Sequence, residues 1–432
     1  MQDKFDKQSI KSLMKEAHIS GGSFANIDAE GSVETLQIGT IAKGSTTKVK
    51  EDISLPCASL SKPVFAYLVL KLIEANKTNT AEPGLGKFNT EFNLDTPLYT
   101  LFRDKDGQAM PDAENTFLKK FLADHQENAK KITGKMVLSH TTGLHIMGAE
   151  PYKFQFEPGT KYAYSGIGIE CLEETIKKLA GADLETLAKQ HIFDPLNMTH
   201  STYGPNPVAA NSLITTAEEY AHFIREWIND DTLNYAFNPV PPADSMENDF
   251  FPQSEDNPVE AIEVTAEDRK RVAWGMGIGL VKNEQGEVIA AFGTGDMNQA
   301  RAGFGATINP QTKSCTEVST YLANSHNGHM LAGKVLPKTC EPALNNFRIY
   351  GFAQNVEQLD GTDFHGLNPT ILKPKFQEMA YKTKIPPRLS CKEELQKIKA
   401  TDPHYMLPTE SSKEKQRDKY SPLSTIPKPW KY

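Results

Sequence analysis

The chain has 432 residues, 38% of them hydrophobic and 24% charged, with a formal net charge of −8. This length allows one large domain or two or three smaller ones, and the balance of apolar and charged residues is typical of a globular protein with a buried core. The negative charge argues against a nucleic-acid-binding protein, whose domains are usually basic. The five cysteines have no Cys-x-x-Cys spacing, so they indicate neither a zinc site nor a disulfide framework.

The first seven residues are polar, and no apolar signal-peptide core follows them. No run of about 18 apolar residues occurs in the chain, which predicts that no segment spans a membrane. We therefore expect a cytoplasmic protein, or one exported without a conventional signal peptide.

The N-terminal part predicts one helix and two strands before a longer helix begins. The expected elements are an amphipathic helix at 5–17 and strands at 23–27 and 33–38, joined by a turn at 28–31. The long apolar helix starts near Ser59 and runs to about residue 76. Residues 77–92 are polar and rich in Gly and Pro, which favours a loop or an insertion.

The middle of the chain predicts helices, at 116–131, 167–180, 183–192 and 216–229. Thr216 is a suitable cap because Glu219 follows at the third helical position. Residues 230–268 hold eleven Asp and Glu and no Lys or Arg. Two interpretations of this acidic, proline-rich segment remain open, a lid over a site and a solvated loop without a role.

After residue 271 the pattern changes to strands, at 274–281, 288–292, 303–308 and 317–323. Two N-terminal and three or four C-terminal strands predict an α+β fold, in which helices flank one antiparallel sheet assembled from both ends of the chain. The helical middle is then an inserted domain. We expect a sheet domain from residues 1–77 and 268–345, a mainly helical domain from 78–267, and a C-terminal extension from 346–432.

The C-terminal extension is basic, unlike the rest of the chain. Residues 381–432 contain twelve Lys and Arg against six Asp and Glu, a local balance of +6. A solvated tail is the default interpretation. The alternatives are a segment that wraps the acidic body and a docking segment for a protein partner.

The candidate catalytic pair lies at the start of the long helix, where Ser59 and Lys62 project from one face, one turn apart. A serine hydroxyl becomes a strong nucleophile when a nearby base removes its proton, and lysine supplies that base in the Ser-x-x-Lys pattern. The spacing occurs four times in the chain, but only here does a long apolar helix follow. The alternative is that Ser59 or Ser61 only caps the helix.

Further motifs follow this pair in order. They are Leu-Ser-His-Thr-Thr-Gly-Leu at 138–144, Tyr-Ala-Tyr-Ser-Gly at 162–166, Phe-Asp-Pro-Leu-Asn-Met at 193–198, Trp-Gly-Met-Gly at 274–277, Phe-Gly-Thr-Gly at 292–295 and Tyr-Leu-Ala-Asn-Ser at 321–325. Together they resemble the serine β-lactamase-like superfamily, closest to its branch of class C β-lactamases, D-alanyl-D-alanine carboxypeptidases and esterases. The resemblance spans about residues 20–335.

The resemblance implies a β-lactamase/transpeptidase-like fold and a role for each site residue. Ser59 attacks a carbonyl and forms an acyl-enzyme, while Lys62 accepts or relays its proton and Tyr164 is the general base. The backbone N–H groups of Ser59 and Asp296 form the oxyanion hole. Tyr162 is the alternative for the tyrosine role. His140 is expected to be a structural histidine and not part of a triad.

Two positions depart from the family pattern. Gly166 stands where the family has an Asn that positions substrate and lysine. Gly293, which precedes Thr294 and Gly295, stands where the family usually has Lys or His. Both changes argue against β-lactam hydrolysis and carboxylate recognition, whereas backbone oxyanion donors survive them.

We therefore expect a serine hydrolase that acts on a small ester or amide, with a D-amino-acid peptide as one candidate. We expect no metal or other cofactor, and no nucleic-acid partner. The alternative is a catalytically weak or inactive protein of the same fold that binds a partner or a peptide in the cleft.

Overall fold

The computed structural model describes residues 4–83, 86–102, 126–144, 154–244, 266–297, 300–325 and 327–347. The chain divides into two compact units, and all of these residues lie in the first, which comprises 1–254 and 264–367. Most of the helix expected at 116–131, the acidic stretch at 245–265 and the C-terminal extension from 348 onward lie outside the described residues. The interpretations of these segments, and the division into sheet and helical domains, therefore stay predictions.

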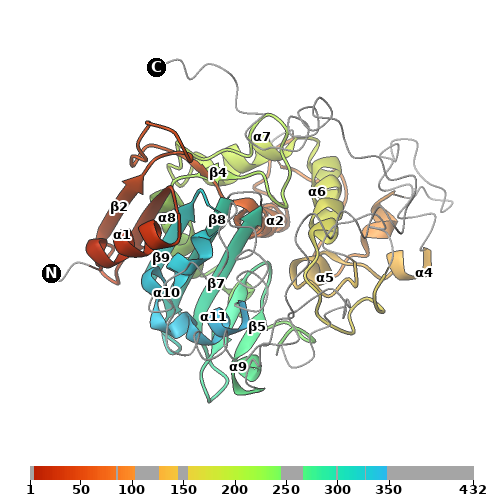
Figure 1. The fold of residues 1–432 in the computed structure, drawn as a ribbon. Coiled ribbons are helices and arrows are strands. Elements are labelled where there is room, and N and C mark those ends of the chain that lie inside the picture. The colour runs from red at the N-terminus through yellow and green to blue at the C-terminus, as the bar shows by residue number, and fades with distance from the viewer. Residues whose placement is uncertain are drawn as a thin grey trace, which may run out of the picture. The chain divides into compact units, whose positions relative to one another are not determined.

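The core of the fold is a seven-stranded antiparallel sheet with the strand order β2-β1-β9-β8-β7-β6-β5. The strands are β1 (Gly21–Ile27), β2 (Val33–Gly39), β5 (Val272–Trp274), β6 (Gly279–Lys282), β7 (Val288–Met297), β8 (Ala300–Ile308) and β9 (Cys315–Ala323). Strand β1 pairs with β9 so that Phe24 lies opposite Tyr321. The prediction of one sheet assembled from both ends is confirmed, and Figure 1 shows these N-terminal strands in red beside the blue-green C-terminal ones.

The C-terminal part contributes five strands, where the sequence predicted three or four. The segment expected as one strand at 274–281 is divided between β5 and β6 by a turn, in which the Gly275 N–H donates to the Ile278 carbonyl at 2.8 Å. Gly277 has a φ of 81°, a left-handed conformation that glycine adopts without strain. A β-carbon at Gly277 would overlap Ala66, so the turn packs closely against the helix that carries Ala66.

Helices cover both faces of the sheet. Helices α2 (Ser61–Lys77) and α8 (Ala217–Asn229) lie on one face, where Tyr220 of α8 packs against Phe304 of β8 with ring centroids 5.7 Å apart. Helices α1 (Lys7–Glu16), α10 (Ala332–Val335) and α11 (Glu341–Phe347) lie with η7 (Gly328–Leu331) and η8 (Lys338–Cys340) on the other (Figure 1). This is the α+β arrangement that the sequence predicted.

The described part of the segment between α2 and β5 is mainly helical. Its elements are η2 (Leu98–Phe102), α4 (Gln126–Ala129), α5 (Gly134–Leu138), α6 (Gly166–Ala180), α7 (Leu184–Ala188) with a π-helical turn to Phe193, and η4 (Asn234–Phe237). Local signals set the helix ends: the Ser165 side chain accepts from Gly168 N–H at the start of α6, and Gly181 ends it with a φ of 68°. Thr216 caps α8 through the Glu219 N–H, as predicted.

The other short elements include α9 (Ala266–Arg271) and the strands β3 (Leu55–Pro56) and β4 (Ile214–Thr215), which form a two-stranded sheet. None of the described helices is long and apolar enough to cross a membrane.

Helix α2 supports the candidate site. Every residue from Ser61 to Leu70 is buried, and so is Leu72. Burial of each Val, Leu or Phe side chain stabilises the fold by about 1.5–3 kcal/mol. Pro63 is tolerated in the first turn because its missing N–H would have no partner within the helix. The helix therefore begins at a fixed place against the sheet.

Candidate active site

Ser59 lies in a short 3₁₀ helix, η1 (Ala58–Leu60), directly before α2. Ala58 has a φ of 48°, a left-handed conformation that costs a non-glycine residue roughly 1–2 kcal/mol. Ser61 stabilises this conformation, because its hydroxyl donates to the Ala58 carbonyl at 2.6 Å and accepts from the Leu213 N–H at 2.9 Å. The backbone around Ser59 is therefore held in a conformation that would otherwise be unfavourable.

Two buried tyrosines brace the same turn. Tyr220 donates to the Leu60 carbonyl at 3.0 Å, and Tyr203 donates to the Ser61 carbonyl at 2.9 Å. The N-cap of α2 is Leu60, and no side chain caps the helix. The alternative that Ser59 or Ser61 acts as the helix cap is therefore wrong.

Lys62 contacts Ser59 directly. Its Nζ donates to Ser59 Oγ at 2.9 Å and to the Ala210 carbonyl at 2.7 Å, and the residue is only 5% exposed. The two side chains that the sequence paired are thus hydrogen-bonded, with the amine on the buried side of the hydroxyl.

Tyr164 is the tyrosine that contacts Lys62. The Lys62 Nζ lies 5.0 Å from the centre of its ring, a cation–π distance. Tyr162, the alternative, is 5% exposed and belongs to an apolar cluster with Trp274 and Phe292. Within the described part of the chain, no hydrogen bond joins the Tyr164 hydroxyl to Ser59 or Lys62, so its role as the base stays a prediction.

His140 packs against the Tyr164 ring. Its ring centre is 4.2 Å from that of Tyr164, and its Nδ1 accepts the Ser165 N–H at 3.1 Å. Burial, with a smaller contribution from the Lys62 charge, lowers the pKa of His140 to about 3. The ring is therefore neutral at ordinary pH, in agreement with the structural role predicted for it.

Strand β7 approaches the nucleophile turn through its glycines. A β-carbon at Gly295 would overlap the Cys57 carbonyl oxygen and lie 3.2 Å from the Leu60 nitrogen. At Gly293 it would lie 2.6 Å from Phe304 Cε1 and 3.2 Å from Leu60 Cδ2. The fully buried Phe304 ring thus occupies the space that a side chain at residue 293 would need.

The neighbouring residues of β7 point the other way. Because side chains alternate along a strand, Thr294 and Asp296 project from the opposite face to Gly293 and Gly295. There Asp296 forms an ion pair with the buried Arg301 at 3.1 Å and lies 3.9 Å from His329 Nε2. The side chain of Asp296 therefore lies away from Ser59, and only its backbone can take part in the predicted site.

Gly166 is buried at the first position of α6, two residues after Tyr164. The structure thus brings Ser59, Lys62 and Tyr164 together and places Gly293 and Gly295 next to the Ser59 turn. It separates the side chains of Thr294 and Asp296 from that group.

No sequence motif identifies the segment whose backbone contacts Lys62. Residues 213–215 pair with 55–57, through the β3–β4 pairing and a Cys57 N–H bond to the Leu213 carbonyl at 2.9 Å. The Ala210 carbonyl just before them accepts from Lys62. A backbone carbonyl has no residue signature, so no motif could have identified Ala210.

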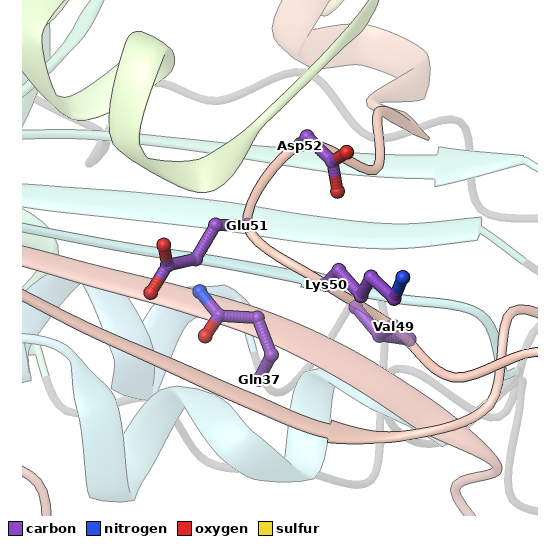
Figure 2. Close-up of a pocket in the computed structure, with 5 residues that line it drawn as sticks. All are labelled: Gln37, Val49, Lys50, Glu51 and Asp52. Atoms are coloured by element: carbon purple, nitrogen blue, oxygen red, sulfur yellow. The ribbon is translucent and has the colours of Figure 1, made fainter.

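The described ranges contain no group of three or more His, Cys, Asp and Glu residues that could hold a metal ion. A surface pocket of about 420 Å³ lies away from these residues and is lined by Gln37, Val49, Lys50, Glu51 and Asp52 (Figure 2). Figure 2 shows that its lining comes from β2 and from the segment between β2 and β3. The contacts of Ser59 and Lys62, and not this pocket, therefore define the candidate site.

The sequence matches the profile of the Beta-lactamase family over residues 7–333. The chain belongs to this family, and with it to the serine β-lactamase-like superfamily. A comparison of the sequence with curated proteins gives no significant match.

Solved structures show the same fold at low sequence identity. The structure of SurE has a TM-score of 0.53 at 16% identity and covers 78% of this chain and 74% of its own. The D-alanine carboxypeptidase AmpC from Burkholderia cenocepacia has a TM-score of 0.51 at 15% identity, with 80% and 97% covered. A class C beta-lactamase has a TM-score of 0.51 at 14% identity, with 83% and 96% covered.

Proposed function

We propose that the protein is a serine hydrolase that forms an acyl-enzyme on Ser59. The observation that carries the proposal is the 2.9 Å hydrogen bond from the buried Lys62 Nζ to Ser59 Oγ, on a turn braced by Ser61, Tyr203 and Tyr220. A nucleophile and a base at this distance, both fixed by surrounding packing, are the requirement for covalent catalysis.

In the first half-reaction Ser59 Oγ bonds to the substrate carbonyl carbon, and its proton passes to the lone pair of Lys62 Nζ, which acts in this step as the neutral amine. The carbonyl oxygen becomes an oxyanion that accepts from the backbone N–H groups of Ser59 and Asp296. Collapse of this intermediate breaks the bond to the leaving group, which takes the proton back from Lys62, with Tyr164 as the relay. Water then attacks the acyl ester by the same steps and releases the acid and free Ser59.

The substrate class follows from the β7 side of the site. With glycine at 293 and Phe304 against it, β7 provides no cationic side chain there for a substrate carboxylate. A small neutral ester or amide therefore fits better than a β-lactam, whose carboxylate would lack that partner. A D-amino-acid peptide is the second candidate, supported by the structural likeness to a D-alanine carboxypeptidase.

A binding function without catalysis is the alternative. It is favoured by the two glycines at 166 and 293 and by the packing of the Tyr164 ring, rather than its hydroxyl, against Lys62. In this case the cleft binds a peptide or partner, and Ser59 is not activated.

Intact-mass labelling of the full chain tests the proposal. We expect a fluorophosphonate probe to add one adduct to the wild type and none to Ser59→Ala. Ser45→Ala, which alters another Ser-x-x-Lys match, is the control and should be labelled like the wild type. A stable penicillin adduct on Ser59 would move the substrate toward D-alanyl peptides. No labelling of folded wild-type protein would favour the binding function.

A further inference from the structure

A buried carboxyl group of α6 is not explained by the proposed mechanism. Glu173 is only 4% exposed, and it lies on the buried side of α6 among apolar residues that include Ile169, Leu172 and Ile176. A buried carboxyl group is costly unless polar partners satisfy it. Its partners are the Ala209 N–H, which donates to Glu173 Oε2 at 2.7 Å, and Lys177 Nζ, which lies 3.7 Å from Glu173 Oε1.

That hydrogen bond lies next to Lys62. The residue after Ala209 is Ala210, and its carbonyl accepts from Lys62 Nζ at 2.7 Å, while the same Nζ donates to Ser59 Oγ. The Ala209 N–H and the Ala210 carbonyl belong to different peptide units. Glu173 therefore acts on Lys62 by fixing where the backbone of this segment lies, and not through a shared peptide group.

The segment that carries Ala210 is fixed at its two sides by different groups. On the C-terminal side, the Leu213 N–H donates to Ser61 Oγ at 2.9 Å. On the N-terminal side, the Glu173 carboxyl group holds Ala209. Ser61 lies on the nucleophile turn itself, whereas Glu173 ties the segment to α6, the helix that begins two residues after Tyr164.

We propose that Glu173 is a positioning residue for Lys62, which fixes the Ala210 carbonyl through Ala209 and so sets the distance from Nζ to Ser59 Oγ. The inference rests on the proposed function, in which that distance decides how readily the Ser59 proton is removed. A displacement of about 1 Å at a reacting group can cost about 100-fold in rate.

The charge state of Glu173 makes the inference testable by pH. Burial raises its pKa to about 7, against smaller opposing contributions from the Ala209 N–H and Lys177. The other ionisable groups around it are Glu170 and Glu174 on α6 and the buried Tyr203 from the facing segment. Ionisation near pH 7 strengthens the hydrogen bond from Ala209, because charged acceptors bind N–H groups more strongly.

Three variants of the full chain separate positioning from mere packing. Glu173→Gln keeps an oxygen acceptor for the Ala209 N–H but cannot ionise, and Glu173→Ala removes the acceptor. Glu174→Gln changes the adjacent, half-buried carboxylate, which pairs with Lys177 at 2.7 Å, and is the matched control. Thermal unfolding establishes that each variant is folded.

The first readout is the rate of fluorophosphonate labelling of Ser59 between pH 5.5 and 9. We expect the rate of Glu173→Ala to fall about tenfold or more. Glu173→Gln should keep most of the rate at pH 8 but lose an inflection near pH 7 that the wild type shows. Glu174→Gln should keep that inflection, displaced to lower pH because the Glu174 charge raises the pKa of Glu173. Wild-type rates and pH profiles in folded Glu173 variants would overturn the inference.

The second readout does not require hydrolysis. In protein with ¹³C-labelled lysine, the Lys62 signal, assigned by its loss in Lys62→Arg, should shift near pH 7 in the wild type and not in Glu173→Gln. If the wild type is not labelled but this shift is seen, the proposed function fails while the positioning role stands. If the shift is the same in both proteins, the positioning role is wrong.

Discussion

Gly295 of β7 lies directly against the carbonyl of Cys57, two residues before Ser59, with no room for a β-carbon between them. This contact joins the strand that holds Asp296, the proposed second oxyanion donor, to the turn that holds Ser59, the proposed first. Glycine in a strand interior often marks such a close approach of two backbones.

Gly295→Ala should therefore abolish fluorophosphonate labelling of Ser59, because the added methyl group forces β7 away from the turn. Gly168→Ala in α6 is the control, since a β-carbon there would meet its nearest atom at an ordinary 3.5 Å. Labelling of Gly295→Ala at the wild-type rate would exclude a donor from this end of β7.

Tyr164→Phe should lower the rate of hydrolysis of a small chromogenic ester by about 100-fold, the contribution expected of a general base or relay. Tyr162→Phe should change it little, because it is the ring of Tyr164 that lies 5.0 Å from Lys62 Nζ. The reverse outcome would assign the role to Tyr162, and unchanged rates in both would leave Lys62 as the only base.

Gly293→Ala should destabilise the fold by about 1–3 kcal/mol, because its β-carbon overpacks against the Phe304 ring. Phe304→Leu in the same chain should restore part of this loss, since the smaller side chain leaves room. Urea unfolding of the two single variants and the double variant measures the coupling. Additive losses would show that Phe304 does not fill this space.

The buried His140 should make the protein less stable in acid. Its folded-state pKa is lowered to about 3 by burial, so between pH 6.5 and 3 the unfolded chain binds a proton that the folded chain does not. The free energy of unfolding therefore falls as the pH falls, by roughly 1.4 kcal/mol per pH unit for one full proton.

His140→Asn removes that dependence while keeping an acceptor for the Ser165 N–H and a residue type that tolerates positive φ. Chemical unfolding at several pH values should give a slope smaller by about one proton in this range. His329, whose pKa burial also lowers to about 3, remains in both proteins and cancels from the difference. Equal slopes would show that His140 is protonated in the fold.

Patterns that depend on residue type could be predicted from the sequence. The apolar run after Ser59 predicted α2, Thr216 and Glu219 predicted the start of α8, and strand patterns at both ends predicted the single sheet. The hydrogen bond between Ser59 and Lys62 also follows from their spacing, because one helical turn separates them.

Features that depend on backbone groups could not be predicted. Ala210 contributes only its carbonyl, nearly 150 residues after Lys62, and the Gly275–Gly277 turn lies inside a segment whose flanking residues predict one continuous strand. The motif predicts Thr294 and Asp296 beside Gly293 and Gly295, but side chains alternate along β7, so those of Thr294 and Asp296 lie on the other face.

Because β1 pairs with β9, the sheet can be completed only late in the synthesis of the chain. Ser59 and Lys62 leave the ribosome early, but β7 and β9, which complete the turn and the sheet, follow more than 200 residues later. Until then the β1–β2 hairpin has an unpaired edge, a surface on which other chains can add strands. In a nascent chain Ser59 therefore lacks the β7 part of its surroundings. Such a chain depends on protection from aggregation until β9 emerges.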